Sequence, residues 1–343
     1  MRAAAGVYSP LTLTALDSGV RYEGQGAVIS GGALLPPGII VPPTDPIFSR
    51  LSAATRAVTR RFDISDLINA SGSDAVSGKF QLSCDGQAMN LASWPSNGSW
   101  AHTGTAVGPN GFAYPADAPL SSKATEGLWI EGYFIYDWSD SRMPVTSIDQ
   151  SNVTLFADTS AAHYVSSNGH FNADARFWFL NLPEFLQQPG QYWLDTATSM
   201  VYVVLASSDA ATSRGTCTLA VTPTVLEVRD TSHISFTGFS IAAAQETLVT
   251  ISNSSFIEIS NCSVHTGLAG IAVSGGAHVA ITDVEVMSVG STAVSIAGGD
   301  RASLVAGSHS VTNCTIHDYA KVIWCYHPGV KIAGVGHTGE WSL

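Results

Sequence analysis

Side chains able to exchange protons or bind a polar ligand are concentrated near the end of the chain, in the segment IHDYAKVIWCYHPGVKIAGVGH, residues 316–337, and seven of them are considered as site residues. They combine carboxylate, imidazole, ammonium and phenol groups: His317, Asp318, Lys321, Tyr326, His327, Lys331 and His337. Carboxylate and imidazole groups are the usual general acids and bases. We predict Asp318, His317 and His327 as catalytic residues, and Tyr326, Lys331 and His337 as substrate-binding residues. A turn cluster without catalytic role is the alternative that the residues leave open.

Hydrolysis of a glycosidic bond by the common route needs two carboxylates, about 5–5.5 Å apart for retention and about 6.5–9.5 Å apart for inversion. From residue 225 onward the carboxylates available for such a pair are Glu227, Asp230, Glu246, Glu258, Asp283, Glu285, Asp300 and Asp318. We interpret Glu258 and Glu285 as solvated residues on strand faces rather than as catalytic groups. The sequence shows no metal-ligand spacing, so we expect neither a metal nor another cofactor.

A repeat of about 22 residues occupies this same region and must position these side chains. Leu226, Val249, Ile271 and Val294 form one apolar column, and Ile234, Ile257 and Val279 form a second. A third column holds Phe239, Cys262, Val284 and Cys314, and an insertion around DRASLVAG delays the last repeat. Short alternating strands without a helical return predict an all-β solenoid, the right-handed parallel β-helix, whose coils stack about 4.8 Å apart.

A polar column precedes the third apolar column and predicts tight corners. Its members are Gly238, Asn261, Asp283 and Asn313. Asn tolerates left-handed backbone and can pass hydrogen bonds between coils, so we favour an asparagine ladder over glycosylation at Asn261 and Asn313. Sequons at Asn69, Asn97, Asn152 and Asn253 are the better acceptors for sugars.

The five cysteines are scattered, without a CxxC pair, and predict buried, small apolar side chains. They are Cys84, Cys217, Cys262, Cys314 and Cys325. Cys262 and Cys314 share a column two coils apart, about 9–10 Å, which is too far for a disulfide. We therefore expect both to be free and buried.

Four regions follow from the pattern of apolar residues, turns and prolines. Residues 1–32 predict the first coil, 33–79 a Pro-rich connector with a short helix at Leu51–Phe62, 80–220 an inserted β-sandwich-like domain, and 221–343 the remaining coils. The aromatic stretch GLWIEGYFIYDW, residues 127–138, is either the core of the inserted domain, which we favour, or a platform on which sugars stack.

The balance of charge limits the partners. A net charge of −12 leaves no basic face for nucleic acid or an anionic membrane. No run of 18 apolar residues is present, and the start of the chain has no apolar signal segment. A neutral glycan remains compatible with this composition.

Several phrases, in order, resemble the right-handed β-helix (pectin-lyase-like) carbohydrate-active proteins, especially glycoside hydrolases of the fucosidase/xylanase type. They are GVYSPLTLTALDSG, GAVISGG, RLSAATRAVTRRFDISDL, LSCDGQAMNLASWP, WIEGYFIYDWSDSRMPVTSID, FWFLNLPEFLQQPGQYWLDTATSMVYV and VTNCTIHDYAKVIWCYHPGVKIAGVG. Ser93 departs from the Arg usual in this group. The resemblance also implies further coils after HTGEWSL, so we expect the chain to be a fragment.

The resemblance implies a protein of the cell exterior or cell surface that acts on polysaccharide, as a glycoside hydrolase and, at full length, as a monomer. Two alternatives stay open at this point. One is a polysaccharide lyase or epimerase on the same fold, and the other is a non-catalytic carbohydrate-binding or structural module.

Overall fold

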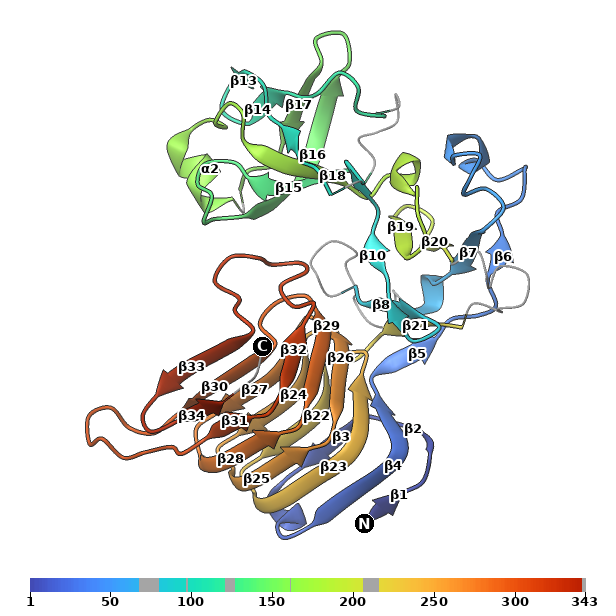
Figure 1. Ribbon diagram of the computed structural model, residues 1–343. Helices are drawn as coiled ribbons and strands as arrows, with labels where there is room; N and C mark the ends of the chain where they lie inside the picture. Colours follow the sequence, from blue (N-terminus) through green and yellow to red (C-terminus); the bar gives the residue numbers. More distant parts are fainter. Residues whose placement is uncertain (68–79, 97, 121–126, 161, 206–215, 341–343) are drawn as a thin grey trace. The chain divides into compact units, whose positions relative to one another are not determined.

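The structure is a computed structural model that describes residues 1–67, 80–96, 98–120, 127–160, 162–205 and 216–340 (Figure 1). It is almost entirely β and divides into two compact units. Unit 1 comprises Met1–Leu34, Asp66–Ala88 and Cys217–Leu343, and unit 2 comprises Leu35–Ser65 and Met89–Thr216. In the part of the chain that the structure describes, no helix has the length and apolar character needed to cross a membrane.

The first parallel sheet of unit 1 confirms the first apolar column of the repeat. Its strands, in spatial order, are β3 (Leu11–Leu13), β22 (Thr224–Arg229), β24 (Thr247–Ser252), β27 (Ala269–Ser274), β30 (Val294–Gly298) and β33 (Val330–Gly334). Leu226 pairs with Val249, Val249 with Ile271, and Ile271 with Val294. Because every pairing is parallel and in register, like side chains stack from coil to coil.

The second parallel sheet of unit 1 bends into two arms, visible as the stacked strands of Figure 1. β4 (Arg21–Ser30) and β23 (Ser232–Ala242) run through both arms. The first arm continues through β25 (Ser255–Ser260), β28 (Ala277–Thr282), β31 (Ser310–Thr312) and β34 (Thr338–Glu340). The second arm, called here the outer arm, continues through β26 (Ser263–Gly267), β29 (Glu285–Val289) and β32 (Thr315–His317). Two short strands, β1 (Arg2–Ala3) and β2 (Gly6–Tyr8), pair with β4, and a 3-10 helix, η1, spans Ala15–Asp17.

The second and third apolar columns are also confirmed. Ile234 pairs with Ile257 and Ile257 with Val279 on the first arm. The four members of the third column are buried at the bend, and Cys262 and Cys314 are free thiols, as expected. The insertion around DRASLVAG forms a small excursion closed by a bridge between Asp300 and Val305.

The polar column forms the bend itself. Gly238, Asn261, Asp283 and Asn313 all have positive φ, between 49° and 78°. The backbone N–H of Asn261 donates to Thr282 of the next coil, 3.2 Å away, and the Asn313 side-chain amide donates to Asp283 Oδ1. The predicted ladder is therefore present at Asp283 and Asn313. Of the predicted sugar acceptors, Asn69 and Asn97 lie outside the described residues.

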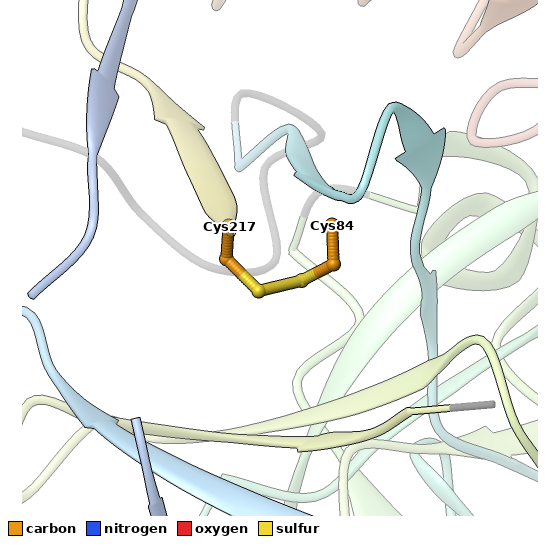
Figure 2. The surroundings of a disulfide bond; sticks show 2 residues. All are labelled: Cys84 and Cys217. Atoms are coloured by element: carbon orange, nitrogen blue, oxygen red, sulfur yellow. A yellow bond between two sulfur atoms is a disulfide. The ribbon is translucent and has the colours of Figure 1, made fainter. Parts of the chain in front are cut away.

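A small antiparallel sheet in unit 1 corrects the expectation for two cysteines. It contains β5 (Gly32–Leu34), β21 (Cys217–Ala220), β8 (Leu82–Cys84) and β9 (Gln87–Ala88). β8 and β21 place Cys84 and Cys217 directly opposite each other, with Cα atoms 4.0 Å apart, and the two form a disulfide (Figure 2). The expectation that these two cysteines are free, small apolar residues is therefore wrong. The pairing of β8 with β21 brings together two cysteines that are 133 residues apart in the sequence.

Unit 2 consists of two sheets with a phenylalanine-rich core. One sheet contains β10 (Asn90–Leu91), β19 (Gln191–Asp195), β20 (Met200–Val204), β7 (Thr59–Asp63) and β6 (Ile39–Ile40). The other contains β11 (Ser93–Trp94), β12 (Ala101–His102), β18 (Arg176–Leu180), β15 (Trp129–Tyr133), β16 (Ser141–Asp149), β17 (Thr154–Ala157), β14 (Gly111–Ala113) and β13 (Ala106–Val107). The short helices are η2 (Phe48–Arg50), α2 (His163–Asn168) and η3 (Pro183–Phe185).

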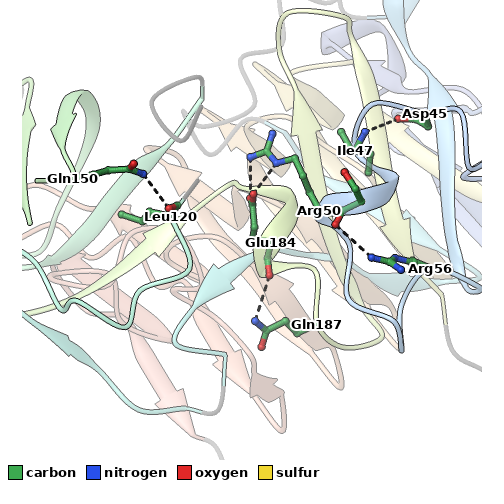
Figure 3. Close-up of polar contacts among 9 residues, drawn as sticks. Asp45, Ile47, Arg50, Arg56, Leu120, Gln150, Glu184 and Gln187 are labelled. Carbon is green, nitrogen blue, oxygen red and sulfur yellow. Dashed lines mark hydrogen bonds and ion pairs between the residues drawn. The ribbon is translucent and has the colours of Figure 1, made fainter. Parts of the chain in front are cut away.

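The helix expected at Leu51–Phe62 is wrong. This stretch forms turns after η2 and then enters β7, where Phe62 pairs with Val201 and is buried. Pairing with β20 overrides the weak helical spacing of the apolar residues. Arg56 Nε holds the turn by donating to the carbonyls of Phe48 and Leu51. The Arg50 guanidinium joins η2 to η3 through two hydrogen bonds to the Glu184 carboxylate, 2.7 and 2.9 Å long (Figure 3).

Candidate functional site

The outward face of the outer arm gathers polar side chains from neighbouring coils. Val264 and Val286 are fully buried, so the alternate residues of β26 and β29 face outward. These outward residues include His265 and Glu285, and β32 adds His317. Parallel register aligns His265 with Met287 and Met287 with His317, while Glu285 pairs with Thr315.

His317 lies between two carboxylates. Its Nδ1 is 2.9 Å from Asp318 Oδ2, and its Nε2 is 3.5 Å from Glu285 Oε1 on the neighbouring coil. The hydrogen bond to Asp318, with a smaller contribution from Glu285, raises the pKa of His317 above its usual value. The imidazolium is therefore favoured when both neighbouring carboxylates are ionised.

A shallow groove of about 470 Å³ runs along the bend beside these residues. Glu285 and Asp283 line it, together with Gly26, Ala27, Gly238, Phe239, Ser240, Asn261, Cys262 and Ser263. Its polar lining consists of hydroxyl, amide and carboxylate groups, with no Lys or Arg among the described residues that line it. Glu285 thus belongs both to the groove and to the cluster around His317.

His265, near Glu285, has the opposite electrostatic environment to His317. Its Nε2 is 3.1 Å from Ser240 Oγ and its Nδ1 is 3.2 Å from Thr266 Oγ1. Desolvation lowers the pKa of His265, although Glu285 opposes this shift. The outer arm therefore carries one imidazole that favours the neutral form and one that favours the charged form. Paired titratable groups with opposed shifts are typical of acid–base sites.

The structure brings together two of the six residues predicted from sequence, His317 and Asp318. Tyr326 is 76% exposed in the loop after Asp318. His327 is in the same loop, and its Nδ1 lies 3.2 Å from Oγ1 of Thr292, a residue between β29 and β30. Lys331 lies on β33, which pairs with β30 in the six-stranded sheet rather than with the outer arm. His337 stacks on the buried ring of His309 at 4.9 Å and contacts the Gly298 carbonyl at 3.0 Å, so its contacts are structural.

Sequence reasoning missed Glu285 and His265 as members of one cluster. A usable signal was present in the repeat. Glu285 lies two residues after the corner residue Asp283, and His265 and His317 each lie four residues after Asn261 and Asn313. Positions two and four residues beyond the corner share one strand face, so the three side chains project the same way.

Among the described residues, no group of three or more His, Cys, Asp or Glu side chains has a geometry that could hold a metal ion. The arrangement instead offers two carboxyl groups, a histidine between them and a polar groove at their side. Such a site can donate and accept protons next to a bound polar ligand.

Comparison with known proteins supports the fold and leaves the activity open. No protein-family model and no curated protein matches the chain. The chain is similar to the solved structure of a glycoside hydrolase, with a TM-score of 0.71, 12% sequence identity, and coverage of 98% of this chain and 72% of that one. It also aligns with the structure of XylC in complex with xylose, with a TM-score of 0.47, 10% identity, and coverage of 96% and 50%. The first likeness shows that the all-β architecture with parallel sheets is shared with a known fold.

Proposed function

We propose that this chain acts on polysaccharide as a glycoside hydrolase, and that unit 1 is a right-handed parallel β-helix whose outer arm holds the substrate. The observation that carries the proposal is the placement of Glu285 and Asp318 on opposite sides of His317, beside an open groove. The likeness to a solved glycoside hydrolase supports the fold part of the proposal. Site chemistry, and not the fold, carries the functional part.

The two carboxyl groups have complementary tasks in this proposal. Hydrolysis needs one group to protonate the leaving glycosidic oxygen and a second to act on the anomeric carbon or on the attacking water. We assign these two tasks to Glu285 and Asp318, which contact the two ring nitrogens of His317. His317 stabilises whichever carboxylate is ionised and orients both side chains.

The lining of the groove favours a neutral glycan. Two carboxylates and no ammonium or guanidinium group face the groove among its described lining residues, so a polyuronate would meet like charge. Hydroxyl and amide groups from Ser240, Ser263 and Asn261 suit hydrogen bonds to sugar hydroxyls. We assign the exposed ring of Tyr326, in the loop after Asp318, to stacking on a sugar of the bound glycan. The cell exterior is the compartment in which such a substrate is met.

The test is a reducing-end assay of the full chain on xylan and on fucosylated oligosaccharides, with polygalacturonate as the acidic comparison. Glu285→Gln and Asp318→Asn should each lower the rate by about 10²-fold or more. Glu258→Gln is the matched control, because Glu258 is an exposed carboxylate on the first arm. Full activity in Glu285→Gln would overturn the assignment. Products that absorb ultraviolet light would indicate a lyase, and binding without turnover would indicate a binding module.

A further inference from the structure

A second group of side chains suited to sugars lies in unit 2, on the loop between β15 and β16. Tyr136 and Trp138 are 44% and 46% exposed, and their rings stack at 4.8 Å with an interplanar angle of 11°. Tyr164 of α2 crosses both rings edge-on, at 5.3 and 5.1 Å. The stretch GLWIEGYFIYDW is thus divided, since Ile130 and Phe134 are buried in the core while Tyr136 and Trp138 reach the solvent.

The neighbouring strand β18 continues this surface. Its inward residues Phe177 and Phe179 are fully buried, and the alternate residues Arg176 and Trp178 are partly exposed. Trp178 stacks on Trp100 at 4.2 Å with an angle of 2°.

A cation and a carboxylate join the two aromatic groups. The Arg176 guanidinium lies over the rings of Trp100 and Tyr133, at 5.3 and 5.0 Å. Arg176 also forms an ion pair with Asp137, 2.9 Å apart, and Asp137 stands between Tyr136 and Trp138 in the sequence. We call this surface the aromatic strip; it comprises Trp100, Trp178, Tyr133, Arg176, Asp137, Tyr136 and Trp138.

The side chains of the aromatic strip are held in place by their neighbours without a ligand. Each ring packs against another ring, and Trp178 Nε1 donates to the Ser99 carbonyl at 2.7 Å. Aromatic side chains have few rotatable bonds, so little conformational entropy remains to be lost on binding. A rigid aromatic surface that the fold keeps partly in solvent is suited to recognition rather than to the core.

The chemistry of the strip selects a glycan over a protein partner. Among the described residues of unit 2, the other exposed large apolar side chains are Ile39 and Ile40 on β6 and Val107 on β13, none of them on this loop. The exposed apolar area at Tyr136 and Trp138 is therefore far below the roughly 800 Å² per partner of a stable protein interface. A sugar ring needs only an aromatic face for its C–H groups and planar polar groups for its hydroxyls. Asp137, whose side chain is 81% exposed, and the Arg176 guanidinium supply the latter.

We propose that the aromatic strip of unit 2 is a glycan-binding site that works separately from the groove of unit 1. The proposal rests on the function given above only in that the ligand is a glycan. It assigns unit 2 the task of holding the polysaccharide, whether or not unit 1 cleaves it.

Affinity gel electrophoresis of the full chain in gels containing soluble xylan, or a soluble β-glucan, tests the strip. The parent chain should be retarded by at least one of these polymers. Trp138→Ala and Tyr136→Ala should weaken binding by about tenfold or more, as expected for an aromatic anchor. Ile40→Ala, another exposed apolar truncation in unit 2, is the matched control, and circular dichroism checks that each variant is folded.

Glu285→Gln changes the groove and not the strip, so retardation through the strip should persist in this variant and should be lost when Trp138→Ala is added. Retardation that survives Trp138→Ala but is lost in Glu285→Gln would place all binding in the groove and overturn the strip while leaving the hydrolase proposal standing. Self-association that disappears in Trp138→Ala, seen by sedimentation at rising protein concentration without any glycan retardation, would make the strip a protein interface and equally overturn it.

Discussion

His317 Nε2 lies 3.5 Å from Glu285 Oε1, across the gap between two neighbouring coils. Glu285 pairs in register with Thr315, two residues before His317, so parallel stacking alone creates this contact. A carboxylate and an imidazole 32 residues apart in sequence become adjacent because the coils repeat.

The titration of His317 should show which of its two neighbouring carboxylates, Asp318 or Glu285, contributes more to its raised pKa. The pKa of His317 is raised, first by the hydrogen bond to Asp318, so its folded-state pKa exceeds the unfolded value of about 6.5. The stability it contributes is complete below that unfolded value and is lost as pH rises through the folded-state pKa. Asp318→Asn should lower the His317 pKa more than Glu285→Gln does, as measured by NMR titration of the ring protons. Equal shifts in the two variants would contradict this order of causes.

The reactivity of the thiols should follow the cysteine assignments. Cys262 and Cys314 are buried, and burial raises the pKa of both thiols, so neither should react with a thiol reagent in the native protein. The half-buried Cys325 should be the single thiol that reacts slowly. Denaturation without a reductant should expose three thiols, and denaturation with a reductant all five. Five reactive thiols before reduction would exclude the disulfide between Cys84 and Cys217.

Replacement of Asn313 by Asp should show how a second negative charge at the bend affects stability. Asn313→Asp places a second carboxylate against Asp283, while Asp still tolerates the positive φ at this position. We expect a loss of about 1 kcal/mol in the free energy of unfolding at pH 7 and low ionic strength, and a smaller loss at high salt, which screens the repulsion between the two side chains. Asn313→Ser is the control, since it removes the side-chain bond without adding charge. Urea unfolding at the two salt concentrations measures the difference, and an equal loss for both variants at low salt would contradict the charge effect.

The buried Glu131 of unit 2 should make stability depend on pH. Burial raises its pKa, against the opposing hydrogen bond from Arg142 Nη2, 2.7 Å long. Because the folded-state pKa is raised, the contribution is complete below the unfolded value of about 4.3 and is lost as pH rises through the folded-state pKa. Relative to Glu131→Gln, the parent chain should therefore lose stability between acidic and neutral pH. Thermal unfolding across this range measures the effect, and a parallel pH profile for the two proteins would exclude it.

The sequence was sufficient to predict the apolar columns, because their spacing of 22 or 23 residues is also their register in the sheets. Leu226, Val249 and Ile271 pair as the alignment placed them. The corner residues Asp283 and Asn313 were likewise predictable, since few residue types accept positive φ. These features depend on neighbouring coils only.

Contacts that depend on distant segments could not be predicted. The pairing of Cys84 with Cys217 requires knowing that β8 and β21 are neighbours in a sheet, although the whole of residues 89–216 separates them. Glu285 resembled an ordinary solvated strand residue until β32 placed His317 against it. Phe62 was misassigned to a helix because four apolar residues at helical spacing carry less information than pairing with β20.

Three of the four points at which the chain passes between the two units lie at the ends of strands of the small sheet: after Leu34 of β5, after Ala88 of β9 and before Cys217 of β21. The register of the stacked coils begins again only at β22, after this sheet. Insertions, exchanges or deletions within unit 2 would therefore leave the register of the parallel sheets in unit 1 unchanged. We therefore expect proteins related to this chain to differ most in the segments that correspond to unit 2.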